Sequence, residues 1–175
     1  MDSGRDTVTP LQAASPRVLE ARHFRDVLGS FTTGVVVVTT VGDDGRPIGL
    51  TVNSFNSVSL DPPLILWSLA LKSPSLRAFR THEYFAINIL AEDQEPLCRQ
   101  FAKPAADKFS DIQFDTGLTG VPVLHSTAAH LECRTYARYP GGDHEIYVGE
   151  VKAVQDHGAS PLVFYRGAVR RLIKH

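Results

Sequence analysis

The sequence predicts one all-β domain, an antiparallel barrel that is closed or nearly closed and carries two or three short helices. Short apolar runs separated by turn residues recur along most of the 175 residues, which is typical of many short strands. A Rossmann fold is excluded because no glycine-rich turn joins a strand to a long helix and strands do not alternate regularly with helices. With 43% hydrophobic residues, the chain can bury the core of one domain.

Charge and cysteine content argue against several classes of function. The net charge is −1 and the 18 Lys and Arg residues are scattered, so we expect no nucleic-acid partner. The N-terminus lacks a secretory signal and no apolar run is long enough to span a membrane, so we expect a cytoplasmic protein without membrane contact. Cys98 and Cys133 lie outside any CxxC pattern, which indicates buried free thiols.

The beginning of the chain divides into two parts. Residues 1–17 show no periodicity and are expected to form a flexible arm, whereas residues 18–175 are expected to form the single domain. An apolar stripe with the spacing i, i+3, i+4, i+7 starts at Phe24 and ends at Phe31. This spacing predicts a short helix whose apolar face lies on the core.

Several later segments are predicted as strands and short helices. A β-branched run, a turn and an apolar run predict a hairpin over residues 35–52. Residues 128–139 alternate, which places Cys133 on one face of a half-exposed strand and both His130 and Glu132 on the other. Serine and proline at residues 73–75 predict a helix start with a hydroxyl cap. Other predicted elements are a strand buried on both sides at 64–69, strands at 84–90, 146–154 and 162–165, a helix around 97–101, and a turn at 140–143.

Five stretches of sequence then occur in a characteristic order. They are GVVVVTT at 34–40, GLTVNSFNSVSLDPPL at 49–64, FAINIL at 85–90, GDH at 142–144 followed by VGEV at 148–151, and LVFYRG at 162–167. In this order and spacing, the chain resembles the short-chain flavin reductase family, the reductase components of two-component flavin monooxygenases. The resemblance implies an FMN-binding split barrel, a homodimer with FMN or FAD at its interface, and a separate flavin-dependent monooxygenase as partner.

The flavin-binding residues are expected mainly in the polar segment at 51–59 and at the helix start that follows. A flavin needs an apolar slot, hydrogen-bonding groups for the ring edge, and donors for its phosphate. In a plainer interpretation, these hydroxyls bond to neighbouring backbone and the serines at 73–75 only cap a helix. The resemblance adds the backbone before the first strand and one aromatic residue. The candidates are Thr33, Gly34, Val35, Val36, Thr51, Val52, Asn53, Ser54, Ser57, Ser59, Ser73, Ser75 and Phe101.

The nicotinamide site is expected at two places, both implied by the resemblance. His144 belongs to the Gly-Asp-His element, although the glycines there are also what a tight turn requires. Tyr165, Arg166 and Gly167 lie where relatives contact the dinucleotide, and a forked guanidinium suits a pyrophosphate; a surface strand end is the alternative. No metal is expected, because Cys133 points away from the face that carries His130.

The expected reaction is hydride transfer from NADH or NADPH to FMN or FAD, with reduced flavin supplied to a separate monooxygenase. This step requires no proton donor or acceptor from the protein, so no catalytic side chain is assigned. Two alternatives share the fold: a flavin-binding store or electron carrier without rapid NAD(P)H oxidation, and an oxidase of the pyridoxamine-phosphate type. The Gly-Asp-His element favours the reductase.

Overall fold

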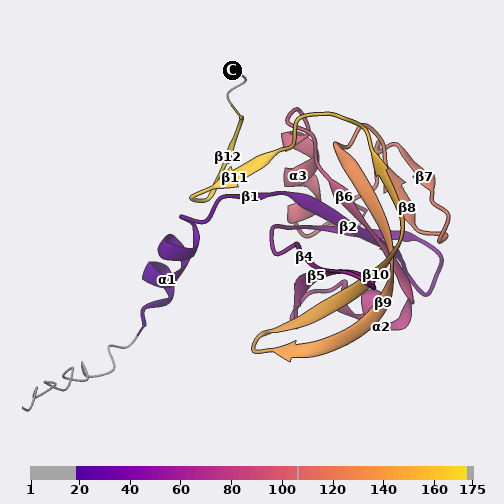
Figure 1. The fold of residues 1–175 in the computed structure, drawn as a ribbon, viewed down its shortest axis with the longest axis horizontal. Coiled ribbons are helices and arrows are strands. Elements are labelled where there is room, and N and C mark those ends of the chain that lie inside the picture. The colour runs from indigo at the N-terminus through magenta and orange to yellow at the C-terminus, as the bar shows by residue number, and fades with distance from the viewer. Residues whose placement is uncertain (1–18, 106, 173–175) are drawn as a thin grey trace, which may run out of the picture.

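The computed structural model describes residues 19–105 and 107–172, so the expected arm at 1–17 lies outside the described residues. The regular structure of the described chain is mainly antiparallel β-strand, with three short helices, which confirms the predicted fold class (Figure 1). Seven strands form one ladder. In spatial order they are β3 (Pro47–Val52), β2 (Val36–Val41), β6 (Tyr84–Ile89), β9 (Ala129–Gly141), β10 (His144–Asp156), β5 (Pro63–Ala70) and β4 (Asn56–Leu60).

The seven-stranded sheet curves without closing into a barrel by strand pairing. β3 and β4 are the two edges of the ladder, and residues 53–55 connect them directly. Ser54 in this linker holds β5, because its hydroxyl accepts a hydrogen bond from the Ser68 N–H at 3.0 Å and contacts the Ser68 carbonyl at 3.3 Å. The predicted fold class is therefore confirmed, but the prediction of a closed barrel was wrong, because the edge strands β3 and β4 do not pair with each other.

The interior of the barrel is filled by aromatic side chains around Trp67. Its ring centroid lies 4.8 Å from that of Tyr147, 5.0 Å from Phe79 and 5.7 Å from Phe85, and all four side chains are buried. Gly149 is required here, because a Cβ at this position would lie 2.5 Å from the Phe85 ring. Contacts of this kind fix β5, β6 and β10 against one another.

Strand β5 is buried on one face only. Ile65, Trp67 and Leu69 point into the core, whereas the alternating residues Leu64 and Leu66 are half-buried. The prediction of a strand buried on both sides was wrong, because the positions that alternate with the core residues, including the polar Ser68, are only half-buried.

Helices α2 (Leu76–Thr81) and α3 (Glu95–Ala102) and the hairpin β7 (Phe114–Thr116) and β8 (Pro122–Leu124) surround the barrel. α3 packs on β3 so closely that a Cβ on Gly49 would lie 2.5 Å from the Phe101 ring. α2 begins later than the sequence indicated. Ser73 is not its cap, and the Ser73 hydroxyl instead accepts a hydrogen bond from the Ser75 N–H at 3.3 Å.

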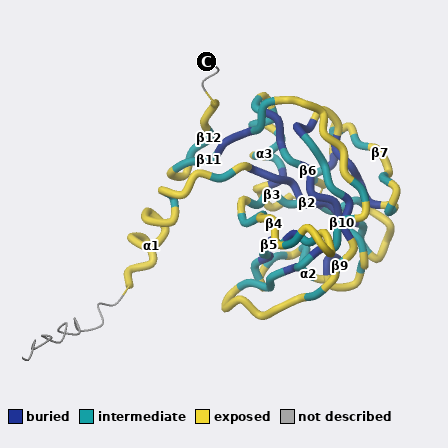
Figure 2. The backbone as a smooth tube through the Cα atoms, viewed as in Figure 1, coloured by how far each residue is buried: buried dark blue, intermediate teal, exposed yellow. Residues whose placement is uncertain are grey.

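A second, smaller sheet leaves the barrel together with the first helix. It consists of β1 (Thr33–Gly34), β11 (Val163–Tyr165) and β12 (Ala168–Arg170) in the order β1-β11-β12. With α1 (Ala21–Leu28) it forms a unit that projects to one side in Figures 1 and 2. From here on, "the arm" means this unit and not residues 1–17. Every residue of α1 is described and none is buried, and Phe31 is 75% exposed. The prediction that this helix lies on the core was therefore wrong.

Strand β9 departs from the alternation that its sequence suggested. Glu132 was expected on the outer face, yet it is only 3% exposed. The turn between β7 and β8 covers it, and its carboxylate accepts hydrogen bonds from the N–H groups of Leu118 and Thr119 and from the Thr119 hydroxyl at 2.7–3.1 Å. A loop without periodicity thus converts an outward-facing strand position into a buried one.

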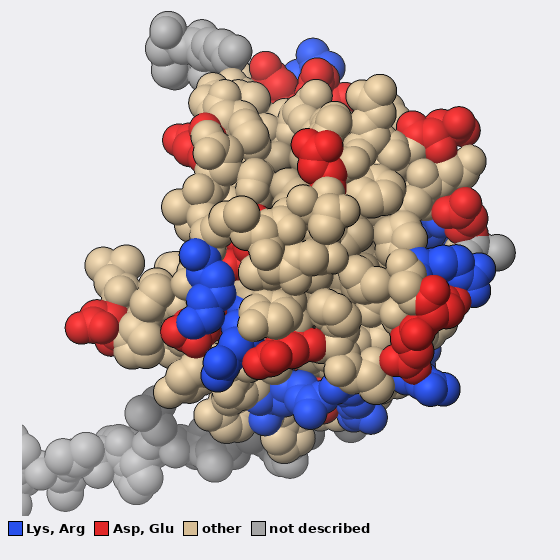
Figure 3. Space-filling model, turned by 90° about the vertical axis from the view of Figure 1, so that its right-hand side faces the viewer, with Lys and Arg blue, Asp and Glu red and all other residues tan. Residues whose placement is uncertain are grey.

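The described cysteines are free thiols. Cys133 is buried in the barrel, and burial raises its pKa to about 12, whereas Cys98 on α3 is half-buried. No helix in the described ranges is long and apolar enough to cross a membrane. On the face shown in Figure 3, acidic and basic side chains are mixed along the edges and uncharged side chains fill the middle.

Candidate functional site

The main cleft lies where the gap in the ladder meets the tip of the β9–β10 hairpin. Its volume is about 570 Å³, within the range of cavities that hold small ligands. The edge strand β3 forms one wall, and the end of β5 with the following loop forms another. The lining residues are Leu50, Thr51, Val52, Asn53, Ser54, Ser68, Leu69, Ala70, Ser73, Gly141, His144 and Ile146.

Strand β3 offers backbone hydrogen-bonding groups to this cleft. Among the described strands it pairs only with β2, so the N–H and C=O groups on its other edge have no strand partner. The Thr51 hydroxyl donates to the Cys98 carbonyl at 2.8 Å, and Ser54 is engaged with Ser68. For these two residues the alternative to flavin binding holds, because their hydroxyls form hydrogen bonds with backbone groups of the protein. The backbone of β3 and the Asn53 amide remain available for a ligand.

The helix start at Ser73 supplies further polar groups. Ser73 lines the main cleft, and Ser75 lines an adjoining groove of about 800 Å³. Lys108 lines the same groove, half-buried, and its ammonium donates to the Phe101 carbonyl at 2.9 Å. Burial lowers the Lys108 pKa, and no carboxylate among the described residues lies within ion-pair distance of it. A half-buried cation without a counter-charge favours an anionic ligand.

His144 enters the cleft from the turn of the β9–β10 hairpin. Its Nδ1 lies 2.7 Å from the Asp143 Oδ1, and this hydrogen bond lowers the Asp143 pKa. Because a carboxylate only accepts, Nδ1 carries the proton and Nε2 is left as an acceptor in the neutral ring. Gly142 permits the turn through its φ of +73°.

A side-chain network behind the hairpin was missed by the sequence analysis. Glu145 accepts two hydrogen bonds from the Arg80 guanidinium, both at 3.2 Å, and one from the Tyr147 hydroxyl at 2.7 Å. Burial alone would raise the Glu145 pKa, but these bonds outweigh it and lower the pKa, while burial and Glu145 raise the Tyr147 pKa. The network ties the strand that carries His144 to α2. No sequence motif marks it, because Arg80 and Glu145 lie 65 positions apart.

The structure brings only part of the candidate set together. The residues that line the main cleft are Thr51, Val52, Asn53, Ser54, Ser73 and His144. The side chains of Val35, Val36 and Phe101 are buried in the core. The remaining candidates line neither wall of the main cleft: Ser57 and Ser59 on β4, Ser75 in the adjoining groove, and Thr33, Gly34, Tyr165, Arg166 and Gly167 in the arm.

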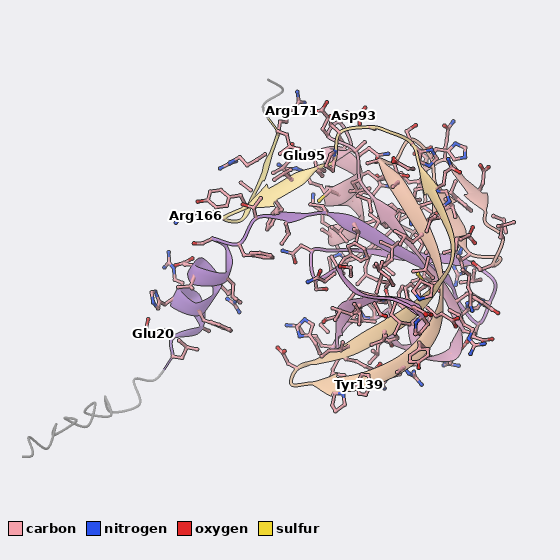
Figure 4. All side chains as sticks on the ribbon, in the orientation of Figure 1. Glu20, Asp93, Glu95, Tyr139, Arg166 and Arg171 are labelled. Atoms are coloured by element: carbon pink, nitrogen blue, oxygen red, sulfur yellow. The ribbon has the colours of Figure 1, made fainter. Side chains whose placement is uncertain are left out.

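In one copy of the chain, the arm residues lie far from the hairpin that carries His144. Figure 4 shows Arg166 on the arm and Tyr139 near the hairpin tip, well separated from each other. The Arg166 N–H donates to the Gly29 carbonyl at 2.9 Å, and Gly167 has a φ of +77°, so this turn is fixed against the end of α1. The Arg166 guanidinium carbon lies 5.5 Å from the centroid of the Tyr165 ring.

One pair of histidines lies outside the main cleft. His130 Nδ1 lies 3.3 Å from His157 Nε2 on the barrel surface. Within residues 19–105 and 107–172, no three His, Cys, Asp or Glu side chains converge as metal ligands.

Comparisons with known proteins agree with this architecture. The family model of the flavin reductase like domain matches residues 28–172. The FMN reductase (NADH) SmoA of Agrobacterium fabrum is 47% identical over 151 residues, 86% of each chain. The monooxygenase reductase subunit HsaB of Rhodococcus jostii is 38% identical over 91% of this chain and 82% of its own. Some relatives are longer: this chain spans 49% of the trigonelline monooxygenase reductase component of Acinetobacter baylyi.

Solved structures support the same assignment. The NADH:FAD oxidoreductase SgcE6 of Streptomyces globisporus, in complex with NAD and FAD fragments, has a TM-score of 0.85 and 35% identity over 92% of this chain and 98% of its own. Nitrilotriacetate monooxygenase component B of Mycobacterium thermoresistibile has a TM-score of 0.83 and 36% identity, over 87% and 86% of the two chains. The family match, the relatives and the split barrel lead to one conclusion: the chain belongs to the flavin reductase family of oxidoreductases.

Proposed function

We propose that this protein oxidises NADH and reduces FMN or FAD in the main cleft, and that the reduced flavin serves a separate monooxygenase. The observation that carries the proposal is the meeting of three features in one cavity: the unpaired edge of β3, the polar loop at Ser73, and His144. The relatives named as NADH-dependent flavin reductases and as monooxygenase reductase subunits support the choice of donor and partner.

The residues of the cleft fit a flavin. Leu50, Val52 and Ile146 offer apolar surface for a flat ring, and the free edge of β3 offers donors and acceptors for its polar rim. Ser73 in the cleft and the uncompensated Lys108 in the adjoining groove suit the phosphate. A bound flavin supplies the hydride acceptor, and the chain supplies binding, orientation and exclusion of water.

His144 is the residue we assign to the nicotinamide. With Nδ1–H held by Asp143, the Nε2 atom can accept a hydrogen bond from the carboxamide N–H₂ of the dinucleotide. The Glu145–Arg80 pair holds the same strand from behind and thereby limits where His144 can lie. This arrangement orients the dinucleotide without moving a proton. Hydride transfer requires only that orientation from the protein.

A second copy of the chain completes the site. Phe24, Val27, Leu28 and Phe31 of the arm are all about half exposed or more, an apolar stripe that one copy leaves uncovered. A homodimer in which each arm lies over the cleft of its partner would bury this stripe and bring Arg166 beside the dinucleotide. Light scattering should report a dimer, and a double substitution of Phe24 and Phe31 by Asp should give monomers that bind flavin poorly. A wild-type monomer that binds flavin at micromolar concentration would contradict this assembly.

Steady-state oxidation of NADH and NADPH, with FMN and FAD added separately, tests the activity. We expect rapid NADH oxidation that depends on added or bound flavin. Tight flavin binding without NAD(P)H oxidation would instead identify the electron carrier or store. Oxygen consumption with pyridoxamine phosphate, in the absence of NADH, would identify the oxidase.

A further inference from the structure

Two histidines from neighbouring strands meet on the surface of the sheet, apart from the main cleft. His130 lies on β9 opposite Gln155 of β10, and His157 follows Gln155 by two residues. The pairing of the two chain segments continues to this point, because the His157 N–H donates to the Ala128 carbonyl at 2.9 Å. Residues two apart on a strand point to the same face, so both imidazoles lie on one face of the sheet.

The two rings approach each other through one nitrogen each. His130 Nδ1 lies 3.3 Å from His157 Nε2, and the planes of the two rings are inclined by 36°. This separation is longer than the usual range of about 2.7–3.2 Å for a hydrogen bond from nitrogen, so the direct contact is weak. Two imidazole nitrogens on one tetrahedral zinc ion, each about 2.0–2.1 Å from the metal, lie about 3.3–3.4 Å apart. The observed spacing therefore fits two ligands of one tetrahedral ion.

The pair can bind an ion with little rearrangement. His130 is half-buried and its backbone is held between β6 and β10, whereas His157 is exposed and follows the end of its strand. A rotation of the His157 ring can aim both lone pairs at one point. A neutral imidazole carries its proton on either nitrogen, so His130 can bind through Nδ1 and His157 through Nε2 without loss of a proton from the pair.

The charges around the pair also favour a cation. Burial and the neighbouring His157 lower the His130 pKa, so the His130 ring is neutral at neutral pH and available as a ligand. The negative charge of Glu132, two residues along β9, acts in the opposite direction and favours positive charge at His130. Because the Glu132 carboxylate is engaged by Leu118 and Thr119, it contributes charge and not a metal ligand.

We propose that His130 and His157 bind one zinc ion, with water in the remaining coordination positions. Imidazole nitrogen suits Zn²⁺, Ni²⁺ and Cu²⁺ better than Mg²⁺ or Ca²⁺. Among these ions the nitrogen spacing favours tetrahedral Zn²⁺, because adjacent ligands in square-planar or octahedral coordination lie closer together. In the described part of the chain no third side chain converges on the pair, so the site is an open one that exchanges its ion, unlike a closed structural zinc site.

A zinc ion at this place would fasten the segment that leads to the arm. Residues 157–162 run from the end of β10 to β11 (Figure 1). The far end of this segment is already held, because the Ser160 carbonyl accepts a hydrogen bond from the Glu92 N–H and the Leu162 N–H donates to the Leu90 carbonyl, both at 2.8 Å. The ion would add a side-chain link at the near end, between His157 and β9.

Isothermal titration of the metal-free protein with zinc chloride at neutral pH tests the proposal. The wild type should bind one zinc ion per chain with a micromolar Kd. His157→Gln keeps a side chain that can hydrogen-bond to His130 but removes the imidazole. It should weaken zinc binding about tenfold or more, since loss of a ligand costs at least as much as loss of a partner that orients one. His130→Gln should have the same effect.

His125→Ala is the matched control. His125 is likewise a surface histidine in a pair, with its Nε2 atom 3.0 Å from the Asp115 carboxylate, and this pair offers zinc an alternative site. The substitution should leave the zinc affinity unchanged. Loss of zinc binding in His125→Ala, with binding retained in His157→Gln, would move the site to the Asp115 pair and overturn the proposal.

Thermal unfolding gives a second readout on the same four proteins. At a zinc concentration of about 100 times the Kd, the wild type and His125→Ala should gain about 5–10 °C in Tm. His157→Gln and His130→Gln should gain nothing under the same conditions. Wild-type zinc affinity in both glutamine variants, or the absence of saturable binding to the wild type at millimolar zinc, would show that the two histidines form only a weak hydrogen bond.

Discussion

Replacing His144 by Ala should separate the two binding events of the reaction. His144 lines the main cleft with 43% of its side chain exposed, and its Nε2 atom is the only ring nitrogen left free by Asp143. The β3 wall, Ser73 and Lys108 do not contact it through any hydrogen bond in the described structure, so flavin affinity should stay within about twofold.

The magnitude follows from the loss of one hydrogen bond at a partly exposed site. Such a bond contributes about 1–2 kcal/mol, which corresponds to a five- to thirtyfold decrease in kcat/KM for NADH. If the bond is equally strong in the ground state and the transition state, the decrease appears mainly in KM. Asp143→Ala should have a smaller effect in the same direction, because the imidazole remains and only its tautomer and orientation are released.

Stopped-flow reduction of flavin-loaded protein, over a range of NADH concentrations, measures the effect directly. A flavin titration on the same preparation supplies the control. Wild-type reduction rates for His144→Ala at every NADH concentration would show that His144 is only a turn residue. The nicotinamide site would then have to lie at Tyr165 and Arg166 on the arm.

Three further predictions concern the packing of the fold and the proposed phosphate site. Gly49→Ala should lower stability by about 1–3 kcal/mol in a urea titration, because the new Cβ meets the Phe101 ring, whereas Gly34→Ala, with open space around it, should be nearly neutral. Burial would raise the Glu132 pKa, but hydrogen bonds from Thr119 and Leu118 lower it. The ionised carboxylate therefore stabilises the fold at neutral pH, and this stabilisation is lost as the pH falls through the lowered pKa. Glu132→Gln should accordingly lower the free energy of unfolding at pH 7 and change it little under strongly acidic conditions. Riboflavin should bind more weakly than FMN, and equal affinities in a fluorescence-quenching titration would remove Ser73 and Lys108 from the phosphate site.

Local sequence patterns predicted the elements of this fold well. The β-branched run and the turn before Pro47 identified the β2–β3 hairpin, because strand propensity and turn chemistry act between near neighbours. The same patterns failed wherever a distant segment decides burial. Periodicity identified the apolar face of α1, but it carries no information about what covers that face. Glu132 is buried by a turn that has no pattern of its own.

The sequence likewise predicted those parts of the site that come from one segment and missed those that come from several. Consecutive residues such as Thr51 to Ser54 were found together in the cleft because one strand carries them. The adjoining groove was not foreseen, since Arg46, Pro74 and Lys108 come from three separate segments and belong to no common motif. The Arg80–Glu145 pair was missed for the same reason. Hydroxyls that looked available in the sequence, on Thr51 and Ser54, are occupied by backbone carbonyl and amide groups.

The gap between β3 and β4 bears on how a product departs. A ligand seated against the free edge of β3 replaces water there, and no strand pair has to open for it to come or go. The three-residue linker 53–55 joins the two edges, and the Ser54 hydroxyl ties this linker to Ser68 on β5. In the proposed function, in which reduced flavin serves a separate monooxygenase, this open edge would let a bulky cofactor enter and leave without the breaking of strand hydrogen bonds.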